Sequence, residues 1–64
     1  MIDPNFEAVT TKTASEMLKI SKSYLEKLRL YDREKSPPFF RIGRAVRYPV
    51  DDLRKWAESR MVGG

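Results

Sequence analysis

The fold is decided by residues 10–30, which read TTKTASEMLKISKSYLEKLRL. A helix begins well at a threonine or serine, because the hydroxyl oxygen can accept a hydrogen bond from a free backbone amide of the first turn. Thr11 is the candidate cap of a first helix. Apolar residues follow it at three- and four-residue spacing, as one face of a helix requires: Ala14, Met17 and Leu18. We expect this helix to run from about Lys12 to Lys19.

A second helix is expected behind Ser21, which can act as its N-cap. Leu25 and Leu28 then face inward, and the helix runs from about Lys22 and ends between Leu30 and Asp32. Only about three residues separate the two helices, so they must cross at a steep angle. This is the helix-turn-helix arrangement.

Lys19 lies between these two helices, at a place where a glycine would relieve a left-handed backbone. A glycine at this place would adopt a left-handed conformation without steric cost. If lysine adopts it, the cost is on the order of 1 kcal/mol.

A β-hairpin is predicted after Ser36-Pro37-Pro38, because prolines lack the amide that would continue a helix. Residues 39–48 read FFRIGRAVRY, which is two short strand-like runs around Gly43 and Arg44. The candidates for the packed faces of this hairpin are Phe40, Ile42, Val46 and Tyr48. The residues expected to project from its exposed face and tip are Arg41, Arg44 and Arg47.

The last helix is expected to begin near Pro49, since proline suits the first helical position. Asp51 and Asp52 complement the positive end of its dipole. Its apolar stripe consists of Val50, Leu53, Trp56 and Ala57. The predicted fold is therefore mainly α with a small β-hairpin, in the order helix, helix, hairpin wing, helix, which is a winged helix-turn-helix.

The chain of 64 residues has room for one domain with a small core. We expect residues 1–8 to form an N-terminal arm that Phe6 or Val9 pins to the core. The winged helix-turn-helix domain then covers residues 9–60. Residues 61–64, which include two glycines, are expected to form a flexible tail.

The charge distribution suggests a polyanionic partner. The chain contains 13 Lys and Arg against 9 Asp and Glu. Nine of the basic and three of the acidic residues lie between Lys19 and Arg47, which leaves four basic and six acidic residues for the rest. A basic centre between acidic flanks produces a directed electrostatic field, as nucleic-acid-binding proteins do.

Composition argues against several other classes of protein. The chain has no cysteine and no histidine, so disulfides and zinc–thiolate sites are excluded, and a haem or a histidine base is not expected. We find no phosphate-binding loop and no nucleophile paired with a base, and so predict no enzymatic activity, no cofactor and no metal. No apolar run could span a bilayer, and the first residues lack the order of a signal peptide. We therefore expect a soluble, cytoplasmic protein that does not bind membranes.

The candidate DNA-binding residues lie on the predicted helix pair and on the wing. The N-terminal half of a recognition helix normally contacts base edges in the major groove. In that half, lysine can donate to guanine, serine can bond either way, and tyrosine can contact a phosphate or a thymine methyl group. An arginine at the wing tip can enter the minor groove, and its neighbours can bind flanking phosphates. The candidates are Thr11, Lys12, Lys22, Ser23, Tyr24, Lys27, Arg41, Arg44 and Arg47.

Residues 10–25 and 37–48, followed by Asp52-Leu53 and Trp56, resemble the excisionase-like and AlpA-type regulators. The resemblance covers roughly residues 9–60. It implies a MerR-like winged helix of a phage or mobile element, in the cytoplasm of a bacterium or a phage-infected cell. Such proteins act as excisionases, which bend DNA and direct a recombinase or integrase toward excision, or as small transcription regulators. Lys19 departs from the family pattern, which has glycine there, and the stretch 30–36 is slightly longer.

Two alternatives remain open at this stage. The chain could be a protein-interaction adaptor that recruits or modulates a recombinase or another phage protein, through residues 1–8 and the last helix with Trp56 and Met61. The net charge of the central segment argues against this as the only role. A single small domain also covers little DNA, so a homo-oligomer or a cooperative array on double-stranded DNA is a reasonable expectation.

Overall fold

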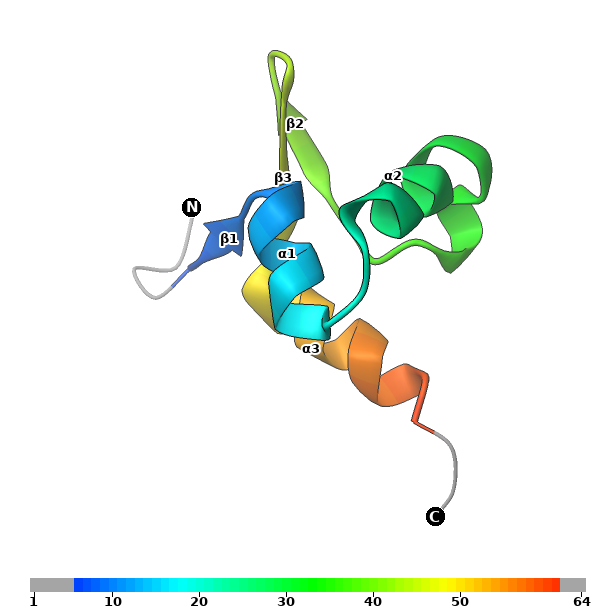
Figure 1. The fold of residues 1–64 in the computed structure, drawn as a ribbon. Coiled ribbons are helices and arrows are strands. Elements are labelled where there is room, and N and C mark those ends of the chain that lie inside the picture. The colour runs from blue at the N-terminus through cyan, green and yellow to red at the C-terminus, as the bar shows by residue number, and fades with distance from the viewer. Residues whose placement is uncertain (1–5, 62–64) are drawn as a thin grey trace.

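The computed structural model describes residues 6–61 (Figure 1). Their elements, in chain order, are β1 (Ala8–Val9), α1 (Thr11–Leu18), α2 (Lys22–Tyr31), the short 3-10 helix η1 (Arg33–Lys35), β2 (Phe40–Ile42), β3 (Ala45–Pro49) and α3 (Val50–Ser59). This confirms the predicted fold class, which is mostly helical with a small antiparallel hairpin. The first five residues of the expected arm and residues 62–64 of the expected tail lie outside the described part of the chain.

Side-chain caps start both helices of the helix-turn-helix, although one is shifted from its predicted residue. Thr10, and not Thr11, caps α1: its hydroxyl oxygen accepts from the amide of Thr13 at 3.1 Å. Thr11 is instead the first residue of the helix and is buried. Ser21 caps α2 as predicted, with its hydroxyl oxygen 3.0 Å from the amide of Tyr24.

In the turn between α1 and α2, Lys19 adopts the left-handed conformation that the sequence had left open. Lys19 has a φ of 60° and a ψ of 37°. Its amide donates to the carbonyl of Glu16, and the amide of Ile20 donates to the carbonyl of Ser15 at 3.0 Å. These bonds satisfy two carbonyl groups at the end of α1 and turn the chain toward α2.

Replacing Lys19 with glycine is expected to stabilise the protein by about 1 kcal/mol, because glycine adopts the left-handed conformation without steric cost. The melting temperature of a domain of this size then rises by roughly 4–8 °C. The control is Lys55→Gly, the same substitution at an exposed position inside α3, which should destabilise the protein by about 1 kcal/mol. Equal losses of stability in both variants would contradict the strained turn.

The hydrophobic core joins the three helices to the wing. Its buried residues are Ala14 from α1, Leu25 from α2, Tyr48 from β3 and Leu53 from α3. The partly buried residues that pack against them are Val9, Leu18, Ile20, Phe39 and Val46. Met17, a residue of the expected apolar face of α1, is 49% exposed, because it lies at the edge of that face. The core therefore holds the helix pair and the wing, which carry the predicted DNA-binding residues, in a fixed arrangement.

The sheet contains a strand that the sequence does not predict. β3 is the central strand, and it pairs antiparallel with β2 on one side and with β1 on the other. Ala8, a residue of the expected arm, lies opposite Pro49, and Val9 lies opposite Tyr48. Val9 packs against the core as expected, whereas Phe6 is 43% exposed and lies near the ring of Phe40. A strand of two residues carries no periodic pattern from which it could be recognised.

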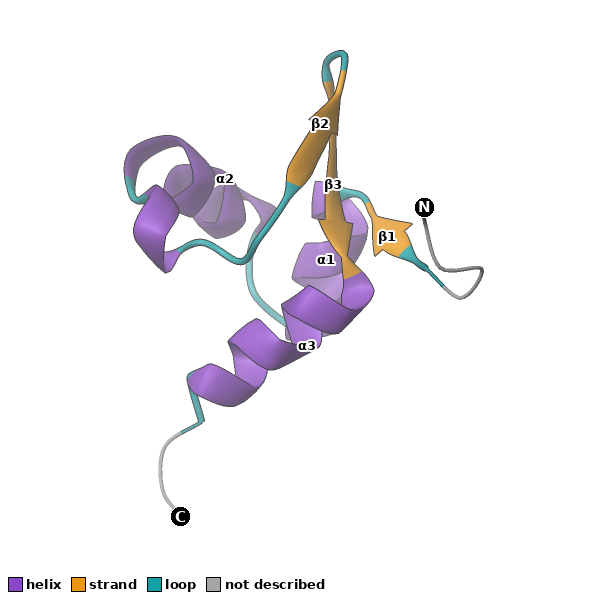
Figure 2. Ribbon diagram, turned by 180° about the vertical axis from the view of Figure 1, so that it is seen from behind, coloured by secondary structure: helices purple, strands orange, loops and turns teal. Residues whose placement is uncertain are grey.

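The β2–β3 hairpin, residues 40–49, extends away from the helices (Figure 2) and is called the wing below. Ile42, a candidate for a packed face, is instead 69% exposed. It lies opposite Ala45 at the outer end of the wing, where no helix covers it. Pro49, expected at the first helical position of α3, is instead the N-cap, and α3 begins at Val50.

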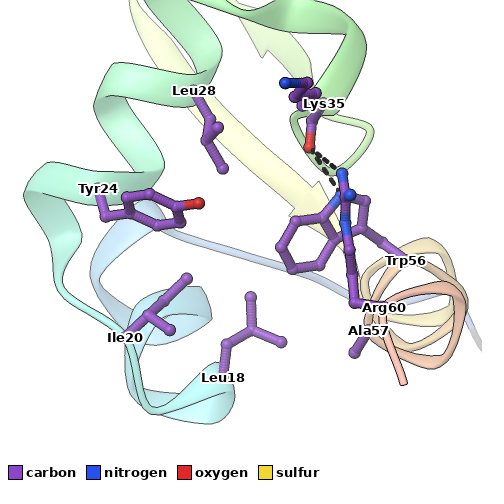
Figure 3. Close-up of a pocket in the computed structure, with 8 residues that line it drawn as sticks. All are labelled: Leu18, Ile20, Tyr24, Leu28, Lys35, Trp56, Ala57 and Arg60. Carbon is purple, nitrogen blue, oxygen red and sulfur yellow. Dashed lines mark hydrogen bonds between the residues drawn. The ribbon is translucent and has the colours of Figure 1, made fainter. Parts of the chain in front are cut away.

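α3 is tied to η1 by hydrogen bonds to one backbone carbonyl (Figure 3). The carbonyl oxygen of Lys35 accepts from the indole nitrogen of Trp56 at 2.9 Å and from the guanidinium of Arg60 at 2.8 Å. Beside these bonds, an apolar cleft of about 360 Å³ separates α2 from α3, with Tyr24 on its α2 side. Within the described part of the chain, no helix has the length and apolar character needed to cross a membrane.

Candidate nucleic-acid interface

An open groove of about 290 Å³ lies between the N-terminal ends of α1 and α2 and the wing. Five of the nine predicted DNA-binding residues line it: Thr11, Lys12, Lys22, Arg44 and Arg47. Four of these five are cations, and they come from α1, α2 and the wing, which follows the helix pair in the sequence. We call this feature the basic groove.

The exposed face of α2 borders the basic groove and carries two further predicted residues. Lys22 lies in the groove, and Ser23 and Lys27, which are four residues apart, are exposed on the same helix. The opposite face of α2 is buried through Leu25 and Leu28. Since residues four apart lie on one side of a helix, Ser23 and Lys27 present a polar surface that points away from the core.

Tyr24 does not join this group. It lines the apolar cleft between α2 and α3 and is 51% exposed (Figure 3). Its ring therefore lies at the border between the polar surface of α2 and the cleft.

The wing presents its arginines in two different places. Gly43 has a φ of 61° in the two-residue turn, and Arg44, its neighbour at the tip, is exposed. A positive φ at the first central position is what the type II′ hairpin turn requires. Arg47 is partly buried beside the basic groove, and it donates to the carbonyl of Val46 at 2.8 Å. Arg41, by contrast, lines a separate hollow.

Arg41 shares that separate hollow, of about 620 Å³, with Arg33. The hollow continues along Ser36, Pro37 and Pro38, between η1 and the base of the wing. The structure therefore does not bring Arg41 together with the cations of the basic groove.

Sequence reasoning missed Arg29, which connects α2 to the rest of the interface. Its guanidinium donates to the hydroxyl of Thr11 at 3.2 Å and to the hydroxyl of Tyr48 at 2.9 Å. It also lies 5.9 Å from the ring centre of Phe39. Arg29 lies four residues after Leu25, on the inward side of the helix, and a charged residue at such a position is the signal that could have revealed it.

The hydrogen bond from Arg29 gives Thr11 a structural role in place of an exposed position for DNA contact. Its side chain is buried and receives the hydrogen bond from Arg29, at the floor of the basic groove. Lys12, the next residue, is exposed at the rim. Of the pair predicted at the start of α1, only Lys12 presents an exposed side chain.

Sequence reasoning also missed Glu26, which is not among the predicted DNA-binding residues. Its side chain lines the basic groove, one helical turn after Lys22, and is partly buried. It is the one acidic side chain among the residues that line this groove.

A helix pair with an exposed second helix, beside a wing that carries arginines, defines a winged helix-turn-helix domain. A family model described as "Helix-turn-helix domain" matches residues 8–61, and the chain belongs to this family. The family includes excisionase-like and AlpA-type regulators and is typically non-enzymatic. Membership implies binding to double-stranded DNA. A comparison with curated proteins found no match.

Proposed function

We propose that this protein binds specific sites on double-stranded DNA, as an excisionase (a recombination directionality factor) or as a small transcription regulator of a phage or mobile element. The observation that carries the proposal is the basic groove, where cations of α1, α2 and the wing converge. A surface with this concentration of positive charge, beside a helix with an exposed polar face, fits the backbone and the major groove of one duplex.

In this proposal, each element has a distinct contact with DNA. α2 lies in the major groove, where Lys22, Ser23 and Lys27 reach base edges. The wing follows the backbone, so that Arg44 at its tip enters the adjacent minor groove. Lys12 and Arg47 bind the phosphates that pass between these two contacts.

Tyr24 and Arg41 are assigned to the borders of the interface. The hydroxyl of Tyr24 contacts a phosphate, or its ring contacts a thymine methyl group, at the side of α2 that faces the cleft. Arg41 binds a phosphate beyond the wing, together with Arg33 in the hollow that they share. Thr11 acts through Arg29 and keeps the floor of the basic groove in place.

The test of this function is retardation of DNA fragments from the genomic neighbourhood of the coding sequence, with random DNA as competitor and at several salt concentrations. We expect specific retardation of one fragment. An attachment site with repeated motifs beside an integrase gene would establish the excision role, and an operator that overlaps a promoter would establish the regulatory role. Weak binding that disappears at physiological salt would contradict a sequence-specific function.

Single substitutions should separate base reading from phosphate binding. Lys22→Ala and Lys27→Ala are expected to weaken binding to the specific fragment by about 5- to 150-fold, and binding to random DNA by less, because a base contact contributes about 1–3 kcal/mol of discrimination. Arg44→Ala should weaken binding through lost minor-groove contacts of the wing. Titration of labelled duplexes measures each effect.

The control for these variants is Lys55→Ala, which removes one positive charge from the exposed side of α3, outside the basic groove. Its affinity for both DNAs should stay within about twofold of the original. If Lys22→Ala and Arg44→Ala fold normally and also bind DNA unchanged, the assigned face is wrong.

Two partners in addition to DNA form part of the proposal. Several copies bind adjacent sites, as a dimer or a cooperative array, because one small domain covers little DNA.

An adaptor role toward a recombinase is the alternative function, and the observation that favours it is the apolar cleft between α2 and α3. Met61, just after the C-terminal end of α3, is 78% exposed and adds an apolar side chain to the surface that a partner could contact.

A further inference from the structure

The carboxylate of Glu26 has no ion-pair or hydrogen-bond partner within the described part of the protein. The carboxylate lines the basic groove together with Lys22, Arg29 and Arg44. Nevertheless, the ion pairs within residues 6–61 join other side chains: Lys35 with Asp32 at 3.6 Å, and Arg54 with Asp51. Within the same residues, no side-chain hydrogen bond of Glu26 is formed either.

Stability of α2 does not explain this carboxylate. Lys22 lies four residues before Glu26, which is the weaker orientation for an ion pair on a helix. The carboxylate also lies on the side of α2 that faces the wing, away from the buried Leu25. On the DNA-binding surface it repels the phosphates that the surrounding cations attract. Its presence therefore lowers the affinity for DNA in general, unless one particular contact offsets the repulsion.

We propose that Glu26 is a specificity-determining residue, whose carboxylate accepts a hydrogen bond from the exocyclic amino group of a cytosine in the major groove. This inference rests on the proposed function. A carboxylate can only accept hydrogen bonds, so it needs a donor on the edge of a base. Cytosine presents its N4 amino group without an acceptor beside it, whereas guanine and thymine present acceptors, and adenine presents its N7 acceptor beside its amino group.

The same carboxylate disfavours wrong sites. Where guanine or thymine faces Glu26, two acceptors meet and the carboxylate stays unpaired in the closed interface. Discrimination by repulsion of the wrong partner is an efficient route to specificity. Glu26 thus explains how a surface rich in cations, which bind any DNA, can still distinguish sequences.

The experiment is selection of binding sites from a random duplex library with three proteins: the original chain, Glu26→Gln and Glu16→Gln. Both variants remove one negative charge without changing the size of the side chain. Glu16 is exposed on α1 and does not line the basic groove, so it is the matched control. A random library offers every short sequence to the protein, so the natural site need not be identified first.

We expect the original chain to select a motif with cytosine at one position. Glu26→Gln should replace this cytosine with adenine, because a glutamine amide can bond to both N6 and N7 of adenine. The other positions of the motif should not change. The ratio of affinities for the original motif and for random DNA should fall by about 5- to 150-fold. Glu16→Gln should keep the original motif and ratio.

The outcomes separate this inference from the function on which it rests. If Glu26→Gln selects the same motif as the original chain, Glu26 does not read a base, and the proposed function stands without it. If Glu16→Gln changes the motif in the same way, the effect is one of total charge, which also overturns the inference. If the original chain selects no motif, the proposed sequence-specific function fails, and the inference fails with it.

Discussion

Binding to duplex DNA is expected to weaken roughly 250-fold when the salt concentration rises from about 50 mM to about 200 mM. The basic groove holds four exposed or partly buried cations of the predicted set: Lys12, Lys22, Arg44 and Arg47. Each phosphate that a cation neutralises releases counterions and adds about −0.9 to the slope of log affinity against log salt. Lys12 and Arg47 bind phosphates directly in our proposal, and Lys22, Lys27 and Arg44, whose charges lie between the phosphates that line the grooves, release counterions as well. We therefore expect a total slope of roughly −4.

Fluorescence anisotropy with a labelled duplex at five or more salt concentrations measures this slope. Lys12→Ala and Arg47→Ala should each reduce its magnitude by about 0.9. Lys55→Ala, outside the groove, should leave it unchanged. A slope near zero in the original chain would show that the basic groove is not the surface that binds DNA.

The substitution Arg29→Met is expected to destabilise the fold by about 2 kcal/mol. Methionine keeps much of the length of the side chain but removes the donors to Thr11 and Tyr48. Tyr48 is completely buried, so its hydroxyl would lose its partner where water cannot replace it. A single core in a domain of this size supplies only about 3–5 kcal/mol, so the loss is a large part of the total.

A double-mutant cycle tests the physical reason for this loss. Tyr48→Phe removes the hydroxyl that Arg29→Met would leave unpaired, so the double variant should be less destabilised than the sum of the two single variants. Chemical denaturation gives the free energy of unfolding of all four proteins. Strict additivity of the two losses would contradict the role assigned to the hydrogen bond between these side chains.

Arg33→Met is the matched control. The guanidinium of Arg33 lies 5.6 Å from the ring centre of Phe39, slightly closer than that of Arg29 at 5.9 Å. Arg33 is exposed, however, and donates no side-chain hydrogen bond within residues 6–61. We expect its replacement to cost only about 0.5–1 kcal/mol, which is the usual contribution of an exposed cation–π contact. Equal losses for both arginines would mean that only the ring contact matters.

Arg29 also links the stability of the fold to DNA binding. Arg29 belongs to α2, and the two hydroxyls that it contacts belong to α1 and β3. These contacts hold the helix proposed to enter the major groove against the strand that carries Arg47. Arg29→Met should therefore lose affinity for DNA even under conditions where the variant stays folded, because α2 is no longer held against β3.

The candidate site could be predicted by residue type but only partly by position. Lysines and arginines between Lys19 and Arg47 indicated a nucleic-acid partner, and five of the nine predicted residues do line one groove. The prediction could not separate Arg41 from the other arginines of the wing, because strand alternation alone does not show which hollow a side chain enters. It could not identify Glu26 or Arg29 either, because both become significant only through neighbours from other elements.

What the sequence by itself determined about this protein is its local structure: the cap at Ser21, the left-handed turn at Lys19, the end of the helices before the proline pair, and the glycine turn of the wing. The hydrogen bonds and steric limits behind these features act between residues at most five positions apart, so they can be read along the chain.

Only the tertiary structure decided which side chains meet. The hydrogen bond from Arg29 to Thr11 spans 18 residues, and the bond from Trp56 to Lys35 spans 21. Strand β1 exists because β3 offers it a partner about 40 residues away, and Ile42 is exposed because the wing extends beyond the helices. Such contacts depend on the packing of the whole core. The neighbours that position each side chain there are distant in the sequence and cannot be identified from a local pattern.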